Sequence, residues 1–484
     1  MLALVAALAS ASPVEQYGFG ARAMGRAQGG VALTDGPAAT MLNPAGLTRL
    51  KRQQVLVGYA VMRYDLHDLP EVSWDTNQDG VLDASDGTLD LGPDYEVPDG
   101  VMAAHGWPLG SRLGLGLAFF TPKDRLLRYH NVEPSLPTYL MYENRPLRYA
   151  MAAGLAAEPV DGVSLGLAVR MIPQMRLTTA FTVDAVFAGG ADEVEGAEDL
   201  LEAGVDTHDV TLDLSPGLVP MVGLQVHLGA WAAALDGLWL AGTWRGEGGM
   251  SIDASLDAQI NVGAEDIGEF EPLLFATVAH AALQIYDHYL PRQVQAGASY
   301  TLSDTFSVYV DVQRTWWNRM EVNVARVLEA ELVAPLVDLS EVEVVDGNPL
   351  DLHFRDTTGL RTGTELRLPE WQLPTKASWM RAVVRGGFGY EPAALEAQGE
   401  DTAFLDADRL IFAGGLGFEH GSFWPAVLQG PMAADSFFQL HRLADGELPR
   451  PETSGLREGY PPDGATIPIG GTIWSAGVQW SVEY

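Results

Sequence analysis

The sequence contains no cysteine among its 484 residues. Disulfide bonds, cysteine-ligated metal centres and thiol chemistry are therefore excluded. Long hydrophobic runs are also missing: after residue 11 no stretch reaches 18 uninterrupted apolar residues, so transmembrane helices are not expected. Basic residues are scarce, with 29 Lys and Arg against 64 Asp and Glu and a net charge of −35. This balance argues against binding to nucleic acid or to an anionic surface.

Apolar residues nevertheless make up 47% of the chain, and they occur in short alternating segments. Between residues 163 and 177 the odd positions are mostly large and apolar, whereas the even positions include serine, glycine, glutamine and arginine. The last segment, 474–484, alternates in the same way and ends on the aromatic residue Tyr484. Period-two alternation gives a strand one lipid-facing and one polar face. A soluble antiparallel sheet would alternate as well, so the terminal aromatic residue and the N-terminal segment decide in favour of a membrane barrel.

The N-terminal region divides into two parts. Residues 1–11, MLALVAALASA, form a short apolar run that ends in a small-x-small cleavage pattern, and we expect them to be a signal peptide. No basic residues precede this run, so the true start lies upstream or the signal is atypical. Residues 12–50 are rich in glycine and alanine and have no sustained periodicity. Such a segment cannot bury much apolar surface alone, while Gly18 and Gly20 permit tight turns and close backbone packing. We therefore expect it to plug a barrel formed by residues 51–484.

Residues 17–47, YGFGARAMGRAQGGVALTDGPAATMLNPAGL, resemble the N-terminal hatch of FadL/TodX-type outer-membrane transporters for long-chain fatty acids and other hydrophobic compounds. The triplet Asn43-Pro44-Ala45 is the most specific part of the match. Residues 291–320 and 379–417 are also similar to this family. The resemblance implies an all-β fold, namely a transmembrane antiparallel β-barrel of about fourteen strands in the bacterial outer membrane, with the hatch plugging its lumen.

The same resemblance implies a function. Hydrophobic molecules such as fatty acids or aromatic hydrocarbons would be captured among the external loops, bind in the lumen, and leave sideways into the membrane when the hatch shifts. Uptake would be passive. The gating residues would be Asn43, Pro44 and Ala45, together with Gly18 and Gly20. The expected partners are the hydrophobic ligand, outer-membrane lipid and the barrel-assembly machinery, and the expected state is a monomer.

Alternation and turn signals predict fourteen strands. They cover 54–65, 98–108, 111–121, 145–157, 162–186, 208–233, 238–262, 273–301, 305–330, 360–372, 378–391, 408–420, 434–446 and 470–484. With both termini in the periplasm, all but the last of the inner connections are short, and the outer connections contain the long acidic runs, including 192–209, 329–356 and 391–408. Short periplasmic turns and long polar external loops are typical of outer-membrane barrels.

No catalytic motif is present. The chain has ten histidines but neither a G-x-S-x-G elbow nor an H-E-x-x-H metal pair, and His280 and His288, on one predicted strand, are expected to line the lumen or its rim. We therefore expect that the protein is not an enzyme. The alternative to transport is a structural or adhesive barrel with calcium-ordered acidic surface loops. The hatch argues against this alternative, because a plug is useful chiefly where passage is gated.

Five arginines are predicted to face the lumen, where one or two could hold a ligand carboxylate through charge-assisted hydrogen bonds. They are Arg148, Arg170, Arg176, Arg381 and Arg385. The alternative is that they pair with lumen acids such as Asp311 or simply line water. In the predicted strand 111–121, leucines are expected to face lipid and the small residues between them to leave lumen space.

Several aromatic residues lie near predicted strand ends or on lipid faces. Interfacial girdles are the expected setting for most of Trp316, Trp317, Trp379, Trp474 and Trp480. Arg314 falls on the lipid face of its strand, so we expect either a bulge or a position near the rim.

Residues 75–86, DTNQDGVLDASD, have the spacing of a calcium-binding loop. Oxygen ligands fall at positions 1, 3, 5, 9 and 12, with glycine at 6 and a backbone carbonyl at 7. The predicted ligands are Asp75, Asn77, Asp79, the carbonyl of Val81, Asp83 and Asp86. Aspartate replaces the usual glutamate at the last position, and no helical pattern clearly flanks the loop. We expect a structural Ca²⁺ that orders the first external loop; a solvated acidic loop is the other interpretation.

Overall fold

A computed structural model of the chain describes most of the sequence. The described residues are 19–76, 82, 86–91, 99–123, 135–143, 150–188, 200–265, 275–303, 305–320, 326–333, 354–372, 379–395, 403–421, 430–448, 459–462 and 465–484. For the distal parts of some strands only the backbone is described. Among all these residues, no helix is long and apolar enough to cross a membrane.

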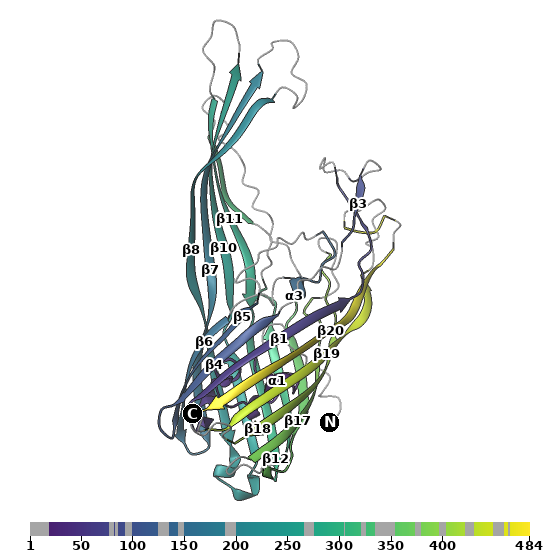
Figure 1. The fold of residues 1–484 in the computed structure, drawn as a ribbon. Helices are drawn as coiled ribbons and strands as arrows, with labels where there is room; N and C mark the ends of the chain where they lie inside the picture. Colours follow the sequence, from purple (N-terminus) through teal and green to yellow (C-terminus); the bar gives the residue numbers. More distant parts are fainter. Residues whose placement is uncertain are drawn as a thin grey trace.

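Fourteen antiparallel strands form a closed barrel (Figure 1). They are β1 (Gln54–Leu66), β4 (Gly100–Pro108), β5 (Leu113–Pro122), β6 (Ala150–Val160), β7 (Val163–Ala188), β8 (Leu200–His227), β9 (Leu238–Arg245), β12 (Arg292–Leu302), β13 (Phe306–Trp316), β15 (Thr357–Arg367), β17 (Trp379–Glu391), β18 (Arg409–His420), β19 (Met432–Leu448) and β20 (Ile467–Glu483). Each strand pairs with the next in this order, and β1 closes the barrel by pairing with β20. The predicted fold class is confirmed.

Two predicted strands, 238–262 and 273–301, each consist of two strands. The chain leaves the barrel after β9, forms a hairpin of β10 (Gly248–Glu265) and β11 (Phe275–Leu290), and re-enters as β12. Pro291 separates β11 from β12, and it has no amide hydrogen with which to continue a ladder. All four segments are extended, so their sequences alternate in the same way. The alternation therefore does not indicate that the chain changes its pairing strand between β9 and β10.

The hairpin builds a sheet that projects from one end of the barrel (Figure 1). β10 runs parallel to the distal part of β7, and β11 pairs with β14 (Arg326–Val333). The remaining short strands are β2 (Val72–Trp74), β3 (Gly87–Leu89) and β16 (Trp371–Gln372). The interpretation of 192–209 and 329–356 as loops is therefore partly wrong, because 200–209 belong to β8 and 329–333 to β14.

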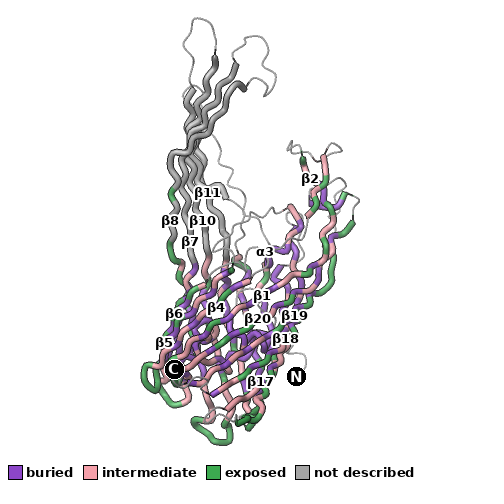
Figure 2. Tube along the Cα trace, viewed as in Figure 1, coloured by how far each residue is buried: buried purple, intermediate pink, exposed green. Residues whose placement is uncertain are grey.

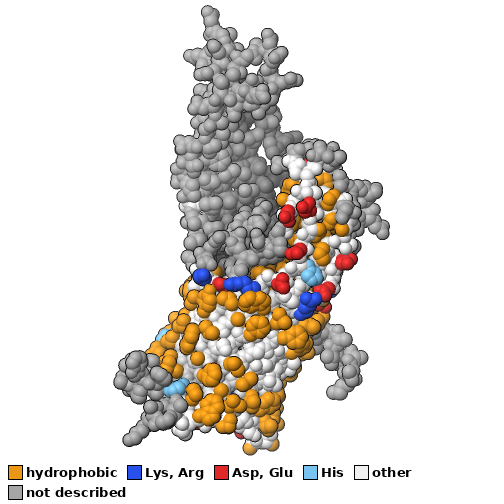
Figure 3. All heavy atoms as spheres, turned by 45° about the vertical axis from the view of Figure 1, so that its right-hand side comes forward, with side chains coloured by type: hydrophobic (Ala, Val, Ile, Leu, Met, Phe, Trp, Pro, Cys, Tyr) orange, Lys and Arg blue, Asp and Glu red, His pale blue; other side chains and the backbone are white. Residues whose placement is uncertain are grey.

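Side chains alternate along the barrel strands between a lumen face and an outer face, as predicted. In β7, Leu167 is 64% exposed whereas Arg170 is 6% exposed. In β20, Trp480 is 53% exposed whereas Ser475 is fully buried. The alternation of buried and exposed positions is visible along the barrel strands in Figure 2. Apolar side chains consequently form a broad band on the outer surface (Figure 3), which is the surface that lipid requires.

The two ends of the barrel differ. The end that carries the C-terminus also carries the short connections 109–112, 161–162 and 303–305. The projecting sheet and the long connections lie at the opposite end (Figure 1). Outer-membrane barrels have short periplasmic turns and long external loops, so we call the first end periplasmic and the second external.

Candidate functional site

Residues 19–50 lie inside the barrel as a series of short helices, and we call them the plug. The helices are α1 (Ala21–Met24), η3 (Val31–Leu33), α2 (Ala39–Leu42) and η4 (Pro44–Arg49). Every residue of the plug is buried or half-buried, although its helices are too short to form an apolar face of their own. Its burial therefore comes from contacts with the barrel wall.

Glycines in the wall let the plug backbone approach the strands closely. A Cβ atom on Gly114 would lie 2.1 Å from the carbonyl oxygen of Leu47, and one on Gly166 would lie 2.3 Å from the nitrogen of Ala45. No side chain fits at such distances, so only glycine is possible without displacing the plug. We call six of the wall glycines that contact the plug the glycine seat: Gly114, Gly116, Gly166, Gly223, Gly387 and Gly415.

The space that the small inward residues of β5 leave is taken by the plug. Leu113 and Leu117 face outward and Gly114 and Gly116 face inward, as predicted. However, a Cβ atom on Gly116 would lie 2.1 Å from the hydroxyl oxygen of Thr40, so the plug fills the space. β5 is also paired with β4 along 100–108 and with β6 along 150–157. The wall is therefore closed over these residues.

Asn43 holds the turn between α2 and η4. Its buried Oδ1 accepts a hydrogen bond from the Ala45 N–H at 3.2 Å. Its Nδ2 donates to the carbonyl oxygens of Val31 at 3.2 Å and Leu224 at 3.4 Å. Pro44 occupies the first position of η4, where its missing amide hydrogen loses no helical bond. The triplet thus ties two parts of the plug to each other and to β8.

Of the two predicted hatch glycines, only Gly20 is among the described residues. Gly20 adopts a φ of 77°, in the left-handed region that favours glycine, and its N–H lies 3.4 Å from the sulfur of Met102. Gly18 lies outside the described residues. The gating role of these glycines and of Asn43, Pro44 and Ala45 stays a prediction.

Buried polar side chains of the wall bond to the backbone of the plug. Asp311 of β13 accepts from the N–H groups of Gly30 and Val31, and Gln439 of β19 donates to the Met24 carbonyl at 2.6 Å. Further contacts of this kind come from Gln225, Tyr309 and Gln479. Buried backbone groups need partners, so these wall residues supply bonds that a short irregular segment cannot make internally.

Two plug arginines join a buried ionic network. Arg26 lies 3.5 Å from Glu365, and Arg22 donates to Asp435 at 3.0 Å. Arg385 bridges the two acids, at 2.8 Å from Glu365 and 2.7 Å from Asp435. The three wall residues are at most 3% exposed. Since buried charges must be paired, this network couples the plug to β15, β17 and β19.

The predicted ligand arginines lie in different settings. Arg385 belongs to the ionic network, and Arg381 pairs with a wall glutamate at 2.8 Å. Arg170 is buried, with a guanidinium nitrogen 3.5 Å from a plug carbonyl. Arg148 lies outside the described residues, and of Arg176 only the backbone is described. Pairing with lumen acids, the alternative considered above, thus holds for Arg385 and Arg381, and contact with a ligand stays a prediction.

Sequence analysis missed Arg22 and Arg26, because a plug without periodicity gives no signal for the direction of its side chains. Glu365 and Asp435 could have been found, since both fall on inward positions of predicted strands. Charged residues are common in barrel lumens, however, and nothing in the sequence pairs these two acids with the plug.

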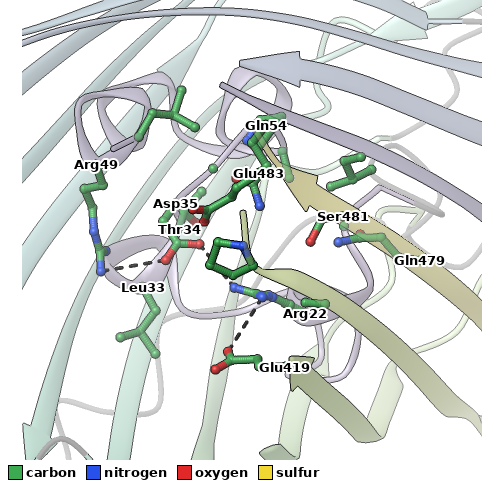
Figure 4. Close-up of a pocket in the computed structure, with 18 of the residues that line it drawn as sticks. Arg22, Leu33, Thr34, Asp35, Arg49, Gln54, Glu419, Gln479, Ser481 and Glu483 are labelled. Atoms are coloured by element: carbon green, nitrogen blue, oxygen red, sulfur yellow. Dashed lines mark ion pairs between the residues drawn. The ribbon is translucent and has the colours of Figure 1, made fainter. Parts of the chain in front are cut away.

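A polar cavity of 520 Å³ separates the plug from the periplasmic ends of several strands (Figure 4). Arg22 and Arg49 converge on Asp35, at 3.8 and 3.9 Å, and Arg22 also lies 3.8 Å from Glu419. The guanidinium of Arg49 lies over the ring of Trp239. These long, partly exposed ion pairs are each weak. The two pairs with Asp35 lie within the plug, whereas the Arg22–Glu419 pair joins the plug to β18.

A large cluster of buried apolar side chains begins at the plug and extends toward the external end of the lumen. The connection between β5 and β6 contributes to it through helix α3 (Leu140–Glu143) and the preceding Tyr139. The wall contributes Met62, Met102, Phe120, Phe437, Leu443 and Ile473, among others. We call this the apolar chamber.

Two residues at the external end of β13 test the aromatic and rim predictions. Trp317 is fully buried in the apolar chamber, so its assignment to an interfacial girdle is wrong; the chain turns into the lumen just after β13 ends. Arg314 faces outward and pairs with Asp356 at 3.3 Å. β13 keeps its register with both neighbours at this point, so the position is a rim and not a bulge.

Of the predicted calcium ligands, Asp75 and Asp86 are described, and Asp86 accepts from the N–H of Thr76 at 3.2 Å. Asn77, Asp79, Val81 and Asp83 lie outside the described residues. Within the described part of the chain no cluster of three or more His, Asp or Glu side chains could hold a metal ion. The calcium site therefore stays a prediction.

No family model and no curated protein matches the sequence, whereas solved structures match the fold. A FadL homologue from Pseudomonas aeruginosa shares 13% identity, covers 99% of this chain and 100% of its own, and gives a TM-score of 0.54. The Ralstonia pickettii toluene transporter TbuX shares 14% identity over 98% and 99% of the chains, with a TM-score of 0.49. The monoaromatic hydrocarbon channel CymD shares 13% identity over 96% and 98%, with a TM-score of 0.48.

A closed antiparallel barrel with an apolar outer band and a lumen filled from within defines a class, the plugged transmembrane β-barrels of the bacterial outer membrane. The match to the FadL homologue covers nearly the whole of both chains. The protein therefore has the FadL-type fold, as the resemblance of residues 17–47 predicts.

Proposed function

We propose that the protein is an outer-membrane channel for passive uptake of hydrophobic small molecules, such as long-chain fatty acids or aromatic hydrocarbons. One observation carries the proposal: the apolar chamber, a cluster of buried apolar side chains, extends toward the external end of the lumen from a plug that is fitted to a seat of glycines. A general porin has an open, polar passage. An apolar chamber closed from below suits molecules that leave water readily.

The proposed path has three steps. A ligand is captured near the external loops, enters the lumen, and passes into the membrane after the plug shifts. The cavity on the periplasmic side supports this step, because it leaves room into which plug residues can move. Lateral exit requires a strand pair to separate, because the pairing of β5 with β4 and β6 is continuous. The resemblance to FadL/TodX-type transporters supports the same order of events.

Uptake measurements test the proposal. Cells that lack the gene and cells that are complemented with it are given a long-chain fatty acid, toluene, an alkane and a small sugar, each radiolabelled. Complementation is expected to restore uptake of at least one hydrophobic compound and to leave sugar uptake unchanged. Equal uptake of every hydrophobic compound in both strains would contradict a transport role, and restored sugar uptake would indicate a general porin instead.

A further inference from the structure

The sheet that projects from the external end of the barrel has two unlike faces (Figure 1). It consists of the distal parts of β8 and β7 followed by β10, β11 and β14, in that order, so β10 is its central strand. We call it the projecting sheet. Alternate residues of a strand belong to opposite faces, and the pairing registers carry this assignment from one strand to the next. Each paired position therefore belongs to a defined face.

One face of the projecting sheet is apolar throughout. Met175 of β7 pairs with Leu214 of β8 and with Ile252 of β10. The paired positions that share this face are occupied by aliphatic residues, phenylalanine, alanine and threonine, and none of them is charged. We call this the apolar face. Its larger residues include Leu177, Phe181, Val183, Phe187, Leu200, Val205, Val210, Leu212, Leu256, Ile260, Val262, Phe275, Leu283, Ile285, Val327 and Leu332.

The opposite face is polar and acidic. Asp253 of β10 pairs there with Arg176 of β7 and with Gln284 of β11. Acidic residues on this face outnumber the basic residues Arg176 and Arg326, and they include Asp184, Asp209, Asp213, Asp253, Asp257, Glu329 and Glu331. Two copies of the chain would repel each other through such a face.

The apolar face continues the lipid-facing surface of the barrel. β7 and β8 keep one register from Val163 to Ala180, so Met175 lies on the same face as Leu167 and Leu218, which are each 64% exposed. A strand crosses a bilayer in about 9–11 residues, which β7 completes before Met175. From there it continues to Ala188, about 45 Å at about 3.3 Å per residue. The surrounding bilayer therefore cannot cover the apolar face.

The apolar face is too large to remain in contact with water. With about 4.8 Å between strands and about 3.3 Å per residue, its area is about 1,000 Å². Contiguous apolar patches on protein surfaces in water rarely exceed a few hundred Å² unless a partner binds them. Within the described part of the chain, the principal contacts of β10 and β11 are with other strands of the projecting sheet. A partner is therefore needed.

We propose that the partner is a second copy of this chain, and that the projecting sheets of two copies pack through their apolar faces. All copies in one membrane share one orientation, so a two-fold axis normal to the bilayer brings the same face of two copies together, as in most homodimers. About 1,000 Å² from each copy gives about 2,000 Å² in total, which is enough for a stable dimer. The acidic faces then lie on opposite sides of the dimer.

The central strand suits this arrangement. Along the apolar face of β10, the large residues Ile252, Leu256 and Ile260 alternate with Ala254 and Ala258. Alternation of large and small residues allows the inner faces of two sheets to interdigitate at a separation of about 10 Å. The dimer differs from the monomer that the family resemblance implies, and it does not depend on the proposed uptake function.

The absence of cysteine permits site-specific cross-linking. Ala258→Cys introduces a thiol on the apolar face of β10, and Ser255→Cys introduces one on the acidic face of the same strand. Intact cells are treated with a bis-maleimide that spans about 10 Å, the separation of packed sheets. A covalent dimer is expected with Ala258→Cys and little with Ser255→Cys. Equal yields in the two variants, whether high or low, would overturn the inference.

Native mass spectrometry measures the oligomeric state without a cross-linker, on protein released from nanodiscs large enough for two barrels. The wild type is expected to be dimeric. Leu256→Asp would bury an unpaired charge in the interface, so the dimer fraction is expected to fall at least about tenfold. Ser255→Asp puts the same charge on the opposite face and is expected to stay dimeric. Heat-modifiable migration checks that each barrel assembles. A monomeric wild type, or dimers in both variants, would overturn the inference.

A fluorophore sensitive to polarity, attached at Ala258→Cys, identifies what else covers the apolar face. In a monomeric protein, an apolar signal would mean that lipid or another segment of the same chain lies there, and an aqueous signal would mean that the face is uncovered. Both results overturn the dimer. A dimer that Leu256→Asp separates, in a protein that restores no hydrophobic uptake, would leave this inference standing while the proposed function fails.

Discussion

Gly223 of β8 and Asn43 of the plug are fitted to each other. A Cβ atom on residue 223 would lie 2.1 Å from Oδ1 of Asn43, the oxygen that accepts from the Ala45 N–H. Glycine within a strand usually weakens it and often marks a close approach of another backbone. Because Gly223 has no side chain, the side chain of Asn43 can occupy the space next to β8.

Gly223→Ala is expected to displace the plug while the barrel still assembles. The added methyl group cannot be accommodated against Asn43 and the nitrogen of Ala45, which would lie 2.9 Å away. Overpacking of this kind costs about 1–3 kcal/mol, and we expect the plug to yield because β8 is fixed in the wall by continuous pairing with β7 and β9. The expected result is a greater permeability to small polar antibiotics, measured as increased sensitivity of cells.

Gly414→Ala is the matched control for this prediction. Gly414 also lies within a barrel strand, but a Cβ atom there would meet nothing within 4 Å. Replacing glycine by alanine changes the strand propensity of the residue equally at 414 and at 223. The two variants therefore differ only in whether the added methyl group contacts the plug. Equal antibiotic sensitivity in the two variants would show that the fit of Gly223 to the plug does not control permeability.

Disrupting the triplet with Asn43→Ala and Pro44→Ala is expected to lower hydrophobic uptake and to leave barrel assembly intact. The change removes the bonds from Asn43 to Val31, Ala45 and Leu224. Each buried group left without a partner costs about 1–3 kcal/mol, so the plug is expected to lose the connections that would let it shift as one unit in the proposed path. Uptake of labelled fatty acid is measured beside heat-modifiable migration. A folded double variant with normal uptake would argue against a gating role.

Alternation predicts the barrel well because it records an environment that acts on every residue of a strand. Each position of β7 or β20 faces either lipid or lumen, so the pattern persists along the strand. Which strand a given strand pairs with does not produce such a pattern in its sequence. The sequence therefore could not show that the chain leaves the barrel after Arg245 to pair β10 with β7.

The site was less predictable for the same reason. Asn43 and Pro44 were found because their triplet resembles a family motif, whereas Gly166 and Gly223 look like any glycine within a strand. Their role depends on a plug more than a hundred residues away in sequence. Trp317 was misassigned because a tryptophan beside a strand end has the same local sequence whether it turns toward lipid or into the lumen.

Arg385→Ala is expected to destabilise the protein without weakening the binding of a fatty acid. The guanidinium is bonded to both Glu365 and Asp435, so its removal leaves two buried carboxylates with fewer partners, at a cost of about 3–5 kcal/mol. Arg381→Ala, whose residue is more exposed and pairs with Glu419, is expected to have a smaller effect. Thermal unfolding in detergent compares the two.

The five arginines predicted to face the lumen can be tested for contact with a ligand carboxylate. Alanine is introduced singly at Arg148, Arg170, Arg176, Arg381 and Arg385, and the affinity for dodecanoate is measured. A loss of affinity confined to one or two variants would identify a carboxylate contact among them. Unchanged affinity in all five would exclude them as contacts of the ligand carboxylate.

Calcium is expected to stabilise the protein through residues 75–86. Asp75, Asn77, Asp79, Asp83 and Asp86 follow the ligand spacing of a calcium loop, with glycine at the turn position. In a chain of net charge −35, a bound divalent cation would relieve local repulsion and order the first external connection. Aspartate in the last position reaches less far than glutamate, so the site is expected to be weak and to fill at the millimolar concentrations found outside cells.

Thermal melts of the detergent-solubilised protein, with calcium and with a chelator, measure this effect. The wild type is expected to melt at a higher temperature in calcium, and Asp75→Ala/Asp79→Ala is expected to melt at one temperature in both conditions. Magnesium distinguishes a specific site from general screening, because it demands a tighter octahedral geometry than calcium does. If wild type and double variant respond identically to calcium and chelator, residues 75–86 are a solvated acidic loop and any stabilisation by calcium comes from other acidic groups.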